Sequence, residues 1–570
     1  MTSVSSTSST ATTATSTSTS SASSTTTSGT KTTTSVDWDA LIEAQVNAKL
    51  ARATTIETKI TANDAKIAAY QNLQTLLSTL SSATNSLSSS IINSLSSSVF
   101  GTRAATITSS GDVSASSALS MSISSGAATG DHTLTISQIA TAEKVLGNAV
   151  SDKSADLGYT GTFSIGLSGS TSADISVTSG MSLEDIVDAV NAQTSTTNVQ
   201  AAIIQVSSTE YEIVLSATED NADIVTGSVS GDDVLNKLGV TESSGGFATI
   251  LQTAQAAIFK LDGIEIMRDT NDITDVLSGV TFNLLQTTPS GAALDISIET
   301  DTSSIQTALE SLVTDYNAFR DYVYSQQQLS TDGTPDSSSV LFGDGTMRDI
   351  TTQIEQALNT SMGGLSLSDL GLSFDETNDL ALDTSTLSTT LTDNLDGVIA
   401  LLANKVTASS SSLSVVNTGS PPPASFTLDL VVDESGNLTS ASVGGDSSMF
   451  TVSGNSIIGN SGTAYSGMAF TYTGSTSQSI AITSTSGIAA QIHSIAKNAS
   501  NTSTGSLQSM ISNLQTQDDS MQQQIDDINS RAALYRTTLT AQYAKYQSAI
   551  STANSMLDYL SALLNSGNSN

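Results

Sequence analysis

The sequence has no cysteine at any of its 570 positions. Disulfide bonds, thiolate nucleophiles and cysteine-ligated zinc are therefore excluded together. Histidine is nearly as scarce, since only His132 and His493 occur. We expect neither to have a carboxylate or a second histidine nearby, and so neither to act as a catalytic base or a metal ligand.

Other signals are also lacking. Nucleophile-elbow, dinucleotide-binding, P-loop and zinc-protease strings do not occur, and acidic loops such as 375–379 and 433–437 lack the regular spacing of a calcium loop. We therefore expect no enzyme activity, no catalytic or metal-binding residues and no cofactor. The 18 basic residues against 54 acidic ones give a net charge of −36 without a basic patch, so we expect no nucleic-acid partner.

Long apolar runs are missing too, and we expect no membrane insertion. The first 35 residues contain 28 Ser or Thr and lack the basic and apolar blocks of a secretory signal. We expect this segment to be a disordered tail, and any export to proceed without a cleaved signal peptide. Dense Ser/Thr also leaves open a glycosylation or export-signal region.

The charge is unevenly distributed. Residues 1–35 carry +1, residues 36–100 carry −1 and residues 505–570 carry −2, which leaves −34 for residues 101–504. Nearly neutral ends suit assembly surfaces, whereas the acidic middle suits a solvated exterior.

What the chain does have is a heptad pattern near each end. Apolar residues recur at alternating steps of four and three from Leu507 to Leu563, with no Gly or Pro between Ser506 and Ser566. A second amphipathic helix is expected after Asp37 and Asp39, which can cap its start, and Trp38 at that start is expected to pack or dock. An average spacing of 3.5 is typical of a coiled coil, so we expect the two helices to pair antiparallel or to pair with neighbouring subunits. The predicted assembly seam comprises Leu41, Val46, Ile56, Ile60, Ile67, Leu77, Leu514, Ile525, Ile528, Leu539, Tyr546, Leu560 and Leu563.

The middle alternates between strand and helix periods. Short alternating runs between Gly and Ser predict strands, Ser182 and Asp185 predict the start of a helix, and 261–264 predicts a hairpin turn. The fold class is α+β and multidomain, with long antiparallel terminal coiled-coil helices, a helical stem and β-rich head domains. We expect a disordered tail at 1–35, N-terminal coiled-coil and stem helices at 36–100, β-rich head domains at 101–300, a helical stem segment at 301–409 with one helix at 387–406, a β insertion at 410–486, and the C-terminal stem and coiled-coil helix at 487–570.

Several ordered motifs resemble one family. The stretches 130–143, 161–165, 181–191, 256–284 and Leu341-Phe-Gly-Asp-Gly-Thr-Met-Arg348 are similar to those of the hook-associated protein 2 family, which caps bacterial flagellar filaments. Asp344 and Arg348 in the last motif are expected to form an ion pair. The resemblance covers roughly residues 36–407 and 488–570; the tail, the 410–486 insertion and the Ser35-Val36-Asp37-Trp38 entry depart from it.

The resemblance implies a structural cap at the distal end of the filament that promotes flagellin insertion, with adhesion as a possible secondary role. It implies a homo-oligomer that meets flagellin and the filament end, hook-associated junction proteins and an export chaperone, outside the cell at the flagellum tip. Two alternatives stay open: a flagellin or hook–filament junction protein, and an acidic secreted adhesin.

Overall fold

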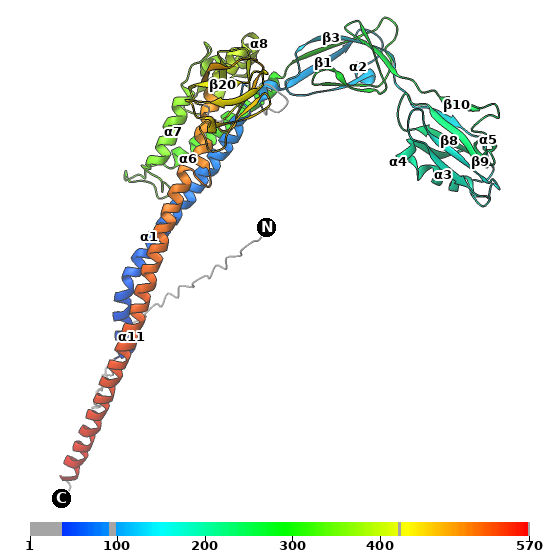
Figure 1. Cartoon of the computed structure of the whole chain (residues 1–570). Coiled ribbons are helices and arrows are strands. Elements are labelled where there is room, and N and C mark those ends of the chain that lie inside the picture. Colours follow the sequence, from blue (N-terminus) through cyan, green and yellow to red (C-terminus); the bar gives the residue numbers. More distant parts are fainter. Residues whose placement is uncertain (1–36, 91–97, 420–422, 568–570) are drawn as a thin grey trace. The chain divides into compact units, whose positions relative to one another are not determined.

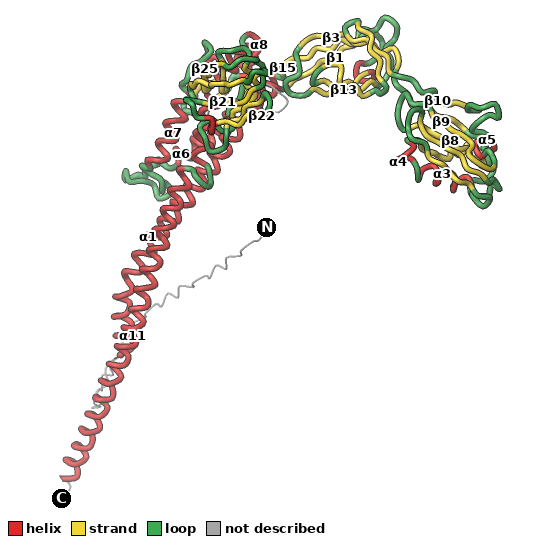
Figure 2. The backbone as a smooth tube through the Cα atoms, viewed as in Figure 1, coloured by secondary structure: helices red, strands yellow, loops and turns green. Residues whose placement is uncertain are grey.

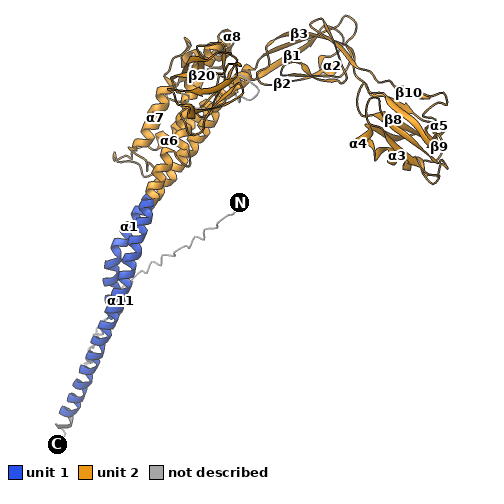
Figure 3. Cartoon of the chain, viewed as in Figure 1, with its two compact units in different colours: residues 1–63, 516–570 blue, residues 64–515 orange. Residues whose placement is uncertain are grey.

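The computed structural model describes residues 37–90, 98–419 and 423–567. The expected tail at 1–35 therefore lies outside the described residues. The chain forms two compact units, one of residues up to 63 with those from 516 onward, and one of residues 64–515 (Figure 3). Two long helices, α1 (Trp38–Asn85) and α11 (Ser506–Gly567), contribute to both units.

The first unit is a pair of helices that run antiparallel (Figure 1). Neither helix contains Pro, and α1 contains no Gly, so nothing interrupts the backbone hydrogen bonding. Asp37 begins α1 by accepting a hydrogen bond from the backbone N–H of Ala40 at 2.9 Å. The pairing of the two helices is described with the functional site.

The second unit contains a helical core that brings together parts of the chain far apart in sequence. Its apolar residues come from α1, from the start of α11 and from the helices between. Asp301, Asp344, Asp383 and Asn394 each accept a backbone N–H in the first turn of a helix. The elements are η1 (Val99–Gly101), α6 (Thr302–Ser325), α7 (Gly345–Leu358), η2 (Leu367–Leu370), β16 (Leu372–Phe374), β17 (Leu380–Leu382), α8 (Thr384–Asp393), α9 (Leu395–Leu402) and α10 (Ile488–Ser500).

A first β domain has two antiparallel sheets around one core. Its hairpin at 261–264 has Asp262 at φ +53° and Gly263 at φ +81°, the left-handed pair of a tight turn. The larger sheet has the order β1 (Arg103–Ser109), β15 (Leu294–Thr300), β3 (Gly130–Gln138), β11 (Ala257–Leu261), β12 (Ile264–Arg268), and the smaller β13 (Asp272–Leu277), β14 (Val280–Leu284), β2 (Leu119–Ile123), with α2 (Ala115–Ala118) before β2.

A second β domain lies in sequence between β3 and β11. Helix α3 (Leu183–Asn191) covers its core, and Ser182 with Asp185 forms the expected capping box at its start. One sheet has the order β10 (Thr249–Gln252), β4 (Lys144–Leu146), β8 (Glu210–Ala217), β7 (Val199–Ser207), and the other β6 (Ala173–Val177), β5 (Gly161–Leu167), β9 (Ile224–Gly231); α4 (Thr194–Thr197) and α5 (Val234–Lys237) complete it.

The third β domain is the expected insertion, with a corrected boundary. The predicted single helix at 387–406 is wrong: Asn394 ends α8 and caps α9, and the chain then becomes extended at 404. Because β18 pairs with β25, residues 404–408 belong to the insertion and not to the stem. Its sheets have the orders β18 (Asn404–Ala408), β25 (Gln478–Ser486), β20 (Ser425–Val432), β21 (Leu438–Ser442), and β19 (Leu413–Thr418), β24 (Met468–Tyr472), β23 (Ser456–Gly459), β22 (Phe450–Ser453), with η3 (Ser447–Met449) between (Figure 2).

Candidate functional site: the terminal helix pair

The apolar seam of the helix pair is built in two clusters. Ile42 and Val46 of α1 pack with Ala532 and Leu539 of α11, and the exposed fractions of these four side chains are 5% or less. Further along, Ala53 and Ile56 pack with Ile525. Each fully buried Leu, Ile or Val contributes about 1.5–3 kcal/mol, so this seam supplies most of the stability of a helix pair that would be marginal as single helices.

Aromatic and polar contacts fix one end of the pair. The Trp38 ring stacks on Tyr543 with ring centroids 5.0 Å apart, and its Nε1 donates to the Gln547 side chain at 2.6 Å. Gln45 bridges two tyrosines, donating to the Tyr543 hydroxyl at 2.9 Å and accepting from the Tyr535 hydroxyl at 3.0 Å. These contacts give the only tryptophan of the chain the packing role expected from its position.

One polar layer interrupts the seam. Asn63 donates to Asp518 Oδ1 at 2.7 Å, so a polar residue in the apolar stripe of α1 meets one in the stripe of α11. The other carboxylate oxygen of Asp518 is buried and has no hydrogen-bond partner among the described residues. A polar pair inside an apolar seam penalises shifted registers, because a shift would bury both groups against apolar side chains.

Helix α11 continues past the start of α1 (Figure 1). We call residues 548–564 the α11 overhang. Asp558 is its only charged residue. Ile550, Leu557 and Leu564 recur every seven residues with Ala553 and Leu560 between them, so the seam pattern continues where α1 does not. The exposed fractions are 43% for Ile550, 64% for Met556, 58% for Leu557, 54% for Leu560 and 73% for Leu564.

The predicted seam residues are divided among three environments. Within the pair, Val46, Ile56, Ile525 and Leu539 are buried and Ile60 and Ile528 are half-buried. Ile67, Leu77 and Leu514 pack in the helical core of residues 64–515. The exposed ones are Leu41, Tyr546, Leu560 and Leu563, at 39%, 47%, 54% and 51%.

The structure differs from the predicted seam at two positions. Ile42 is buried at 5% exposure, whereas Leu41, which the pattern assigned to the seam, is 39% exposed. After Leu539 the seam steps by four to Tyr543, because a straight helix drifts by about 20° per heptad and a longer step restores the facing side. The stack of Trp38 on Tyr543 was missed; a lone tryptophan at the helix start was the signal that could have found it.

Both histidines have structural partners. The expectation that His132 lacks a nearby carboxylate is wrong, because its Nδ1 lies 2.8 Å from Oδ2 of Asp262, in the turn that follows β11. This contact and the Thr133 N–H lower the pKa of Asp262. His493 of α10 is buried, and its Nδ1 donates to the Ser81 carbonyl at 2.8 Å. Burial is the main cause that lowers the pKa of His493.

The expected Asp344–Arg348 ion pair does not form among the described residues. Asp344 instead caps α7 through the Met347 N–H and accepts a hydrogen bond from Tyr70 of α1 at 2.5 Å. Burial and this carboxylate raise the pKa of Tyr70. The motif therefore ties α7 to α1.

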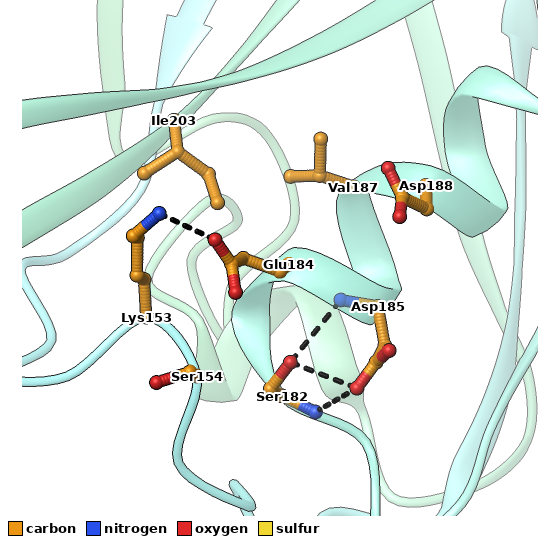
Figure 4. Close-up of a pocket in the computed structure, with 8 residues that line it drawn as sticks. All are labelled: Lys153, Ser154, Ser182, Glu184, Asp185, Val187, Asp188 and Ile203. Carbon is orange, nitrogen blue, oxygen red and sulfur yellow. Dashed lines mark hydrogen bonds and ion pairs between the residues drawn. The ribbon is translucent and has the colours of Figure 1, made fainter.

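A surface depression in the second β domain offers no catalytic constellation (Figure 4). Lys153 is paired with Glu184, which raises the pKa of Lys153. Ser182 and Asp185 bond each other at the start of α3, which lowers the pKa of Asp185. Among the described residues no group of three or more His, Asp or Glu could hold a metal ion, and no helix is long and apolar enough to cross a membrane.

Family comparisons agree with the motifs. Residues 34–143 match the family model of the flagellar hook-associated protein 2 N-terminus, and residues 254–555 match that of its C-terminus. The chain belongs to the flagellar hook-associated protein 2 family. Residues 162–219, in the second β domain, match the flagellin hook IN motif.

Individual relatives have low sequence identity but align over most of the chain. The flagellar hook-associated protein 2 of Escherichia coli K12 is 28% identical over 387 residues, which are 65% of this chain and 78% of that protein. The protein of the same name from Aeromonas caviae is 24% identical over 65% of this chain and 80% of its own length. The crystal structure of the D1–D2–D3 domains of the E. coli flagellar cap protein aligns with 59% of this chain and 90% of its own, at 26% identity and a TM-score of 0.46.

Proposed function

We propose that this protein is the structural cap at the distal end of a bacterial flagellar filament, where it promotes the insertion and polymerisation of flagellin. Membership of the flagellar hook-associated protein 2 family carries this proposal. It works as a homo-oligomer outside the cell at the flagellum tip. Its partners are flagellin, the filament end, hook-associated junction proteins and an export chaperone; adhesion would be a secondary role.

The α11 overhang is the assembly surface in this proposal. Its large side chains are 43% or more exposed, and a helical apolar stripe of that kind is usually covered by another surface. The stretch of α11 that pairs with α1 shows the covered state of the same stripe. Leu539, at the same heptad position as Leu560, is 5% exposed there. We therefore assign Leu557, Leu560 and Leu564 to contacts with neighbouring copies or with the filament end.

The test is a charge placed on the overhang. Leu560→Asp should abolish capping while circular dichroism shows an unchanged fold, because Leu560 is 54% exposed and belongs to no apolar cluster of the described residues. Ser555→Asp is the matched control, since it adds the same charge on the far side of the helix from Leu560. In a strain lacking the native gene, Leu560→Asp should leave flagellin unpolymerised in the medium. Normal swimming with Leu560→Asp would contradict the assignment.

The flagellin alternative predicts a different phenotype. A strain deleted for a filament subunit would have no filament protein to release, whereas a strain deleted for a cap releases flagellin that cannot polymerise. An acidic adhesin would leave swimming intact and change only attachment to surfaces. The deletion strain therefore separates the three functions in one experiment.

A further inference from the structure

The sheet β10-β4-β8-β7 of the second β domain has two very different faces. Side chains alternate between the faces along each strand. Val145, Ile213 and Leu215 point inward to the core formed with α3 and the sheet β6-β5-β9. Their neighbours Leu146 and Val214 therefore point outward, to a face that solvated antiparallel sheets normally fill with polar residues.

This outward face is apolar at its centre. The register places Leu146 opposite Val214 and Val214 opposite Ala202, which makes one apolar row across three strands. Ile204 continues it on β7 and is 47% exposed, and Leu251 of the edge strand β10 is 52% exposed. Val214 is 5% exposed but does not belong to the core on the other side of the sheet. Leu146 is half-buried and Val214 is buried, so the exposed apolar side chains of this face are Ala202, Ile204 and Leu251. Exposed apolar side chains gathered on one face of a sheet are typical of a docking surface.

Two charges flank the row at equal distances along the strands. Lys144 lies two residues before Leu146 on β4 and is opposite Ser216 of β8. Glu212 lies two residues before Val214 on β8, so it is on the opposite side of the apolar row from Lys144. Neither forms an ion pair with any described residue. They are four residues apart in register, or about 13 Å, so they cannot reach each other within one copy.

We propose that this face packs against the same face of a second copy. In this contact a two-fold axis runs along the Leu146–Val214–Ala202 row, between the two packed faces. It brings the Lys144 end of the face in one copy over the Glu212 end of the face in the other. Lys144 of each copy then meets Glu212 of the other, so both charges are paired twice while the apolar rows cover each other. The second β domain is otherwise acidic, and this self-complementarity favours a second copy over a different acidic partner.

The contact is small. Four strands at about 4.8 Å spacing and four residues along each give a patch of roughly 250 Å², well below the ~800 Å² that each partner buries in a stable complex. It therefore belongs to the weak class of contacts. It does not depend on the overhang or on capping to form.

Charge reversal in the full chain tests the pairing. Sedimentation velocity at low salt over a concentration series should show association weakened about tenfold or more by Lys144→Glu or by Glu212→Lys, since each turns two attractions into two repulsions. Mixing the two variants should restore association, because each Lys144→Glu copy then meets a Glu212→Lys copy. The same charge-reversal variants should also be measured in a chain that carries Leu560→Asp. Any association that remains there comes from this sheet face and not from the α11 overhang. Equal association of all variants, or a mixture as weak as the single variants, would overturn the proposal.

The absence of cysteine permits a second test. Lys144→Cys combined with Glu212→Cys should give a cross-linked dimer with a short bifunctional thiol reagent, because packed sheet faces lie about 10 Å apart, too far for a disulfide but within reach of such a reagent. The two sites within one chain lie farther apart than a short reagent spans. Lys144→Cys combined with Asp174→Cys is the control, since Asp174 is exposed on the opposite sheet. A dimer yield no higher than that of the control would reject the face-to-face contact.

Discussion

Two stretches of α11 carry the same heptad pattern and have opposite environments. In the stretch beside α1, Ile525, Ala532 and Leu539 are buried at 5% or less. In the overhang, Leu557, Leu560 and Leu564 are 54% or more exposed. The pattern therefore states that a surface needs covering, but it does not say whether the same chain or another one covers it.

Leu539→Asp should have the largest effect on a single chain. It removes a buried side chain worth about 1.5–3 kcal/mol and places a carboxylate with no partner in the seam, which costs several kcal/mol more. We expect the helix pair to separate, with rapid hydrogen exchange along residues 38–60. Leu560→Asp is the matched variant and should leave that exchange unchanged. Equal exchange in both variants would break the comparison.

Asn63→Leu should have the second largest effect on the stability of the helix pair. It leaves the carboxylate of Asp518 buried without its 2.7 Å donor, which costs about 1–3 kcal/mol. Adding Asp518→Leu should recover the loss, because two apolar residues can replace a buried polar pair at little cost. Thermal unfolding monitored by circular dichroism measures both. A double variant less stable than Asn63→Leu would contradict this expectation. It would show that the polar pair stabilises the helix pair in addition to fixing its register.

Acid should weaken the helical core of residues 64–515. The folded-state pKa of His493 lies below its ordinary value of 6.5, so the protonated form is disfavoured in the fold. Stability is therefore complete above pH 6.5 and falls as the pH drops through 6.5 toward the folded-state pKa. Urea unfolding between pH 7.5 and 5.5 should show this slope, and His493→Gln should flatten it. A slope that His493→Gln leaves unchanged would contradict the assignment.

Trp38→Phe should have the smallest effect. The ring can still stack on Tyr543, and the lost hydrogen bond to Gln547 is worth about 0.5–1.5 kcal/mol. The midpoint of helix-pair melting should fall by a few degrees, while unfolding of the β domains stays unchanged. In the native chain, the fluorescence of Trp38 should report melting of the pair. An unchanged midpoint in Trp38→Phe would show that Gln547 contributes nothing.

Sequence patterns predicted elements whose signals are local. The capping box of Ser182 and the turn at Asp262 and Gly263 depend on neighbouring residues, and both appear where the sequence places them. The pairing of His132 with Asp262 and of Asp344 with Tyr70 could not be read from the chain. Those residues are 130 and 274 positions apart, and only tertiary packing brings them together.

The candidate site was predictable in part for the same reason. The heptad spacing identified the stripe but not the point at which α1 stops accompanying α11. The helix start at Trp38 decides that point, because it fixes Gln547 as the last partner of α1 and leaves Leu560 outside the pair. The single helix predicted at 387–406 failed because Asn394 acts as a cap, which composition does not distinguish from an ordinary helical residue.

Thiol labelling of the overhang tests the central claim most directly. The chain lacks cysteine, so Leu560→Cys introduces one reactive group. Its maleimide reaction should be fast in the free protein and slowed at least several-fold when the protein is assembled at filament ends, whereas Ser555→Cys should slow less. Equal reaction rates of Leu560→Cys in the free and assembled protein would show that the overhang is not the assembly surface.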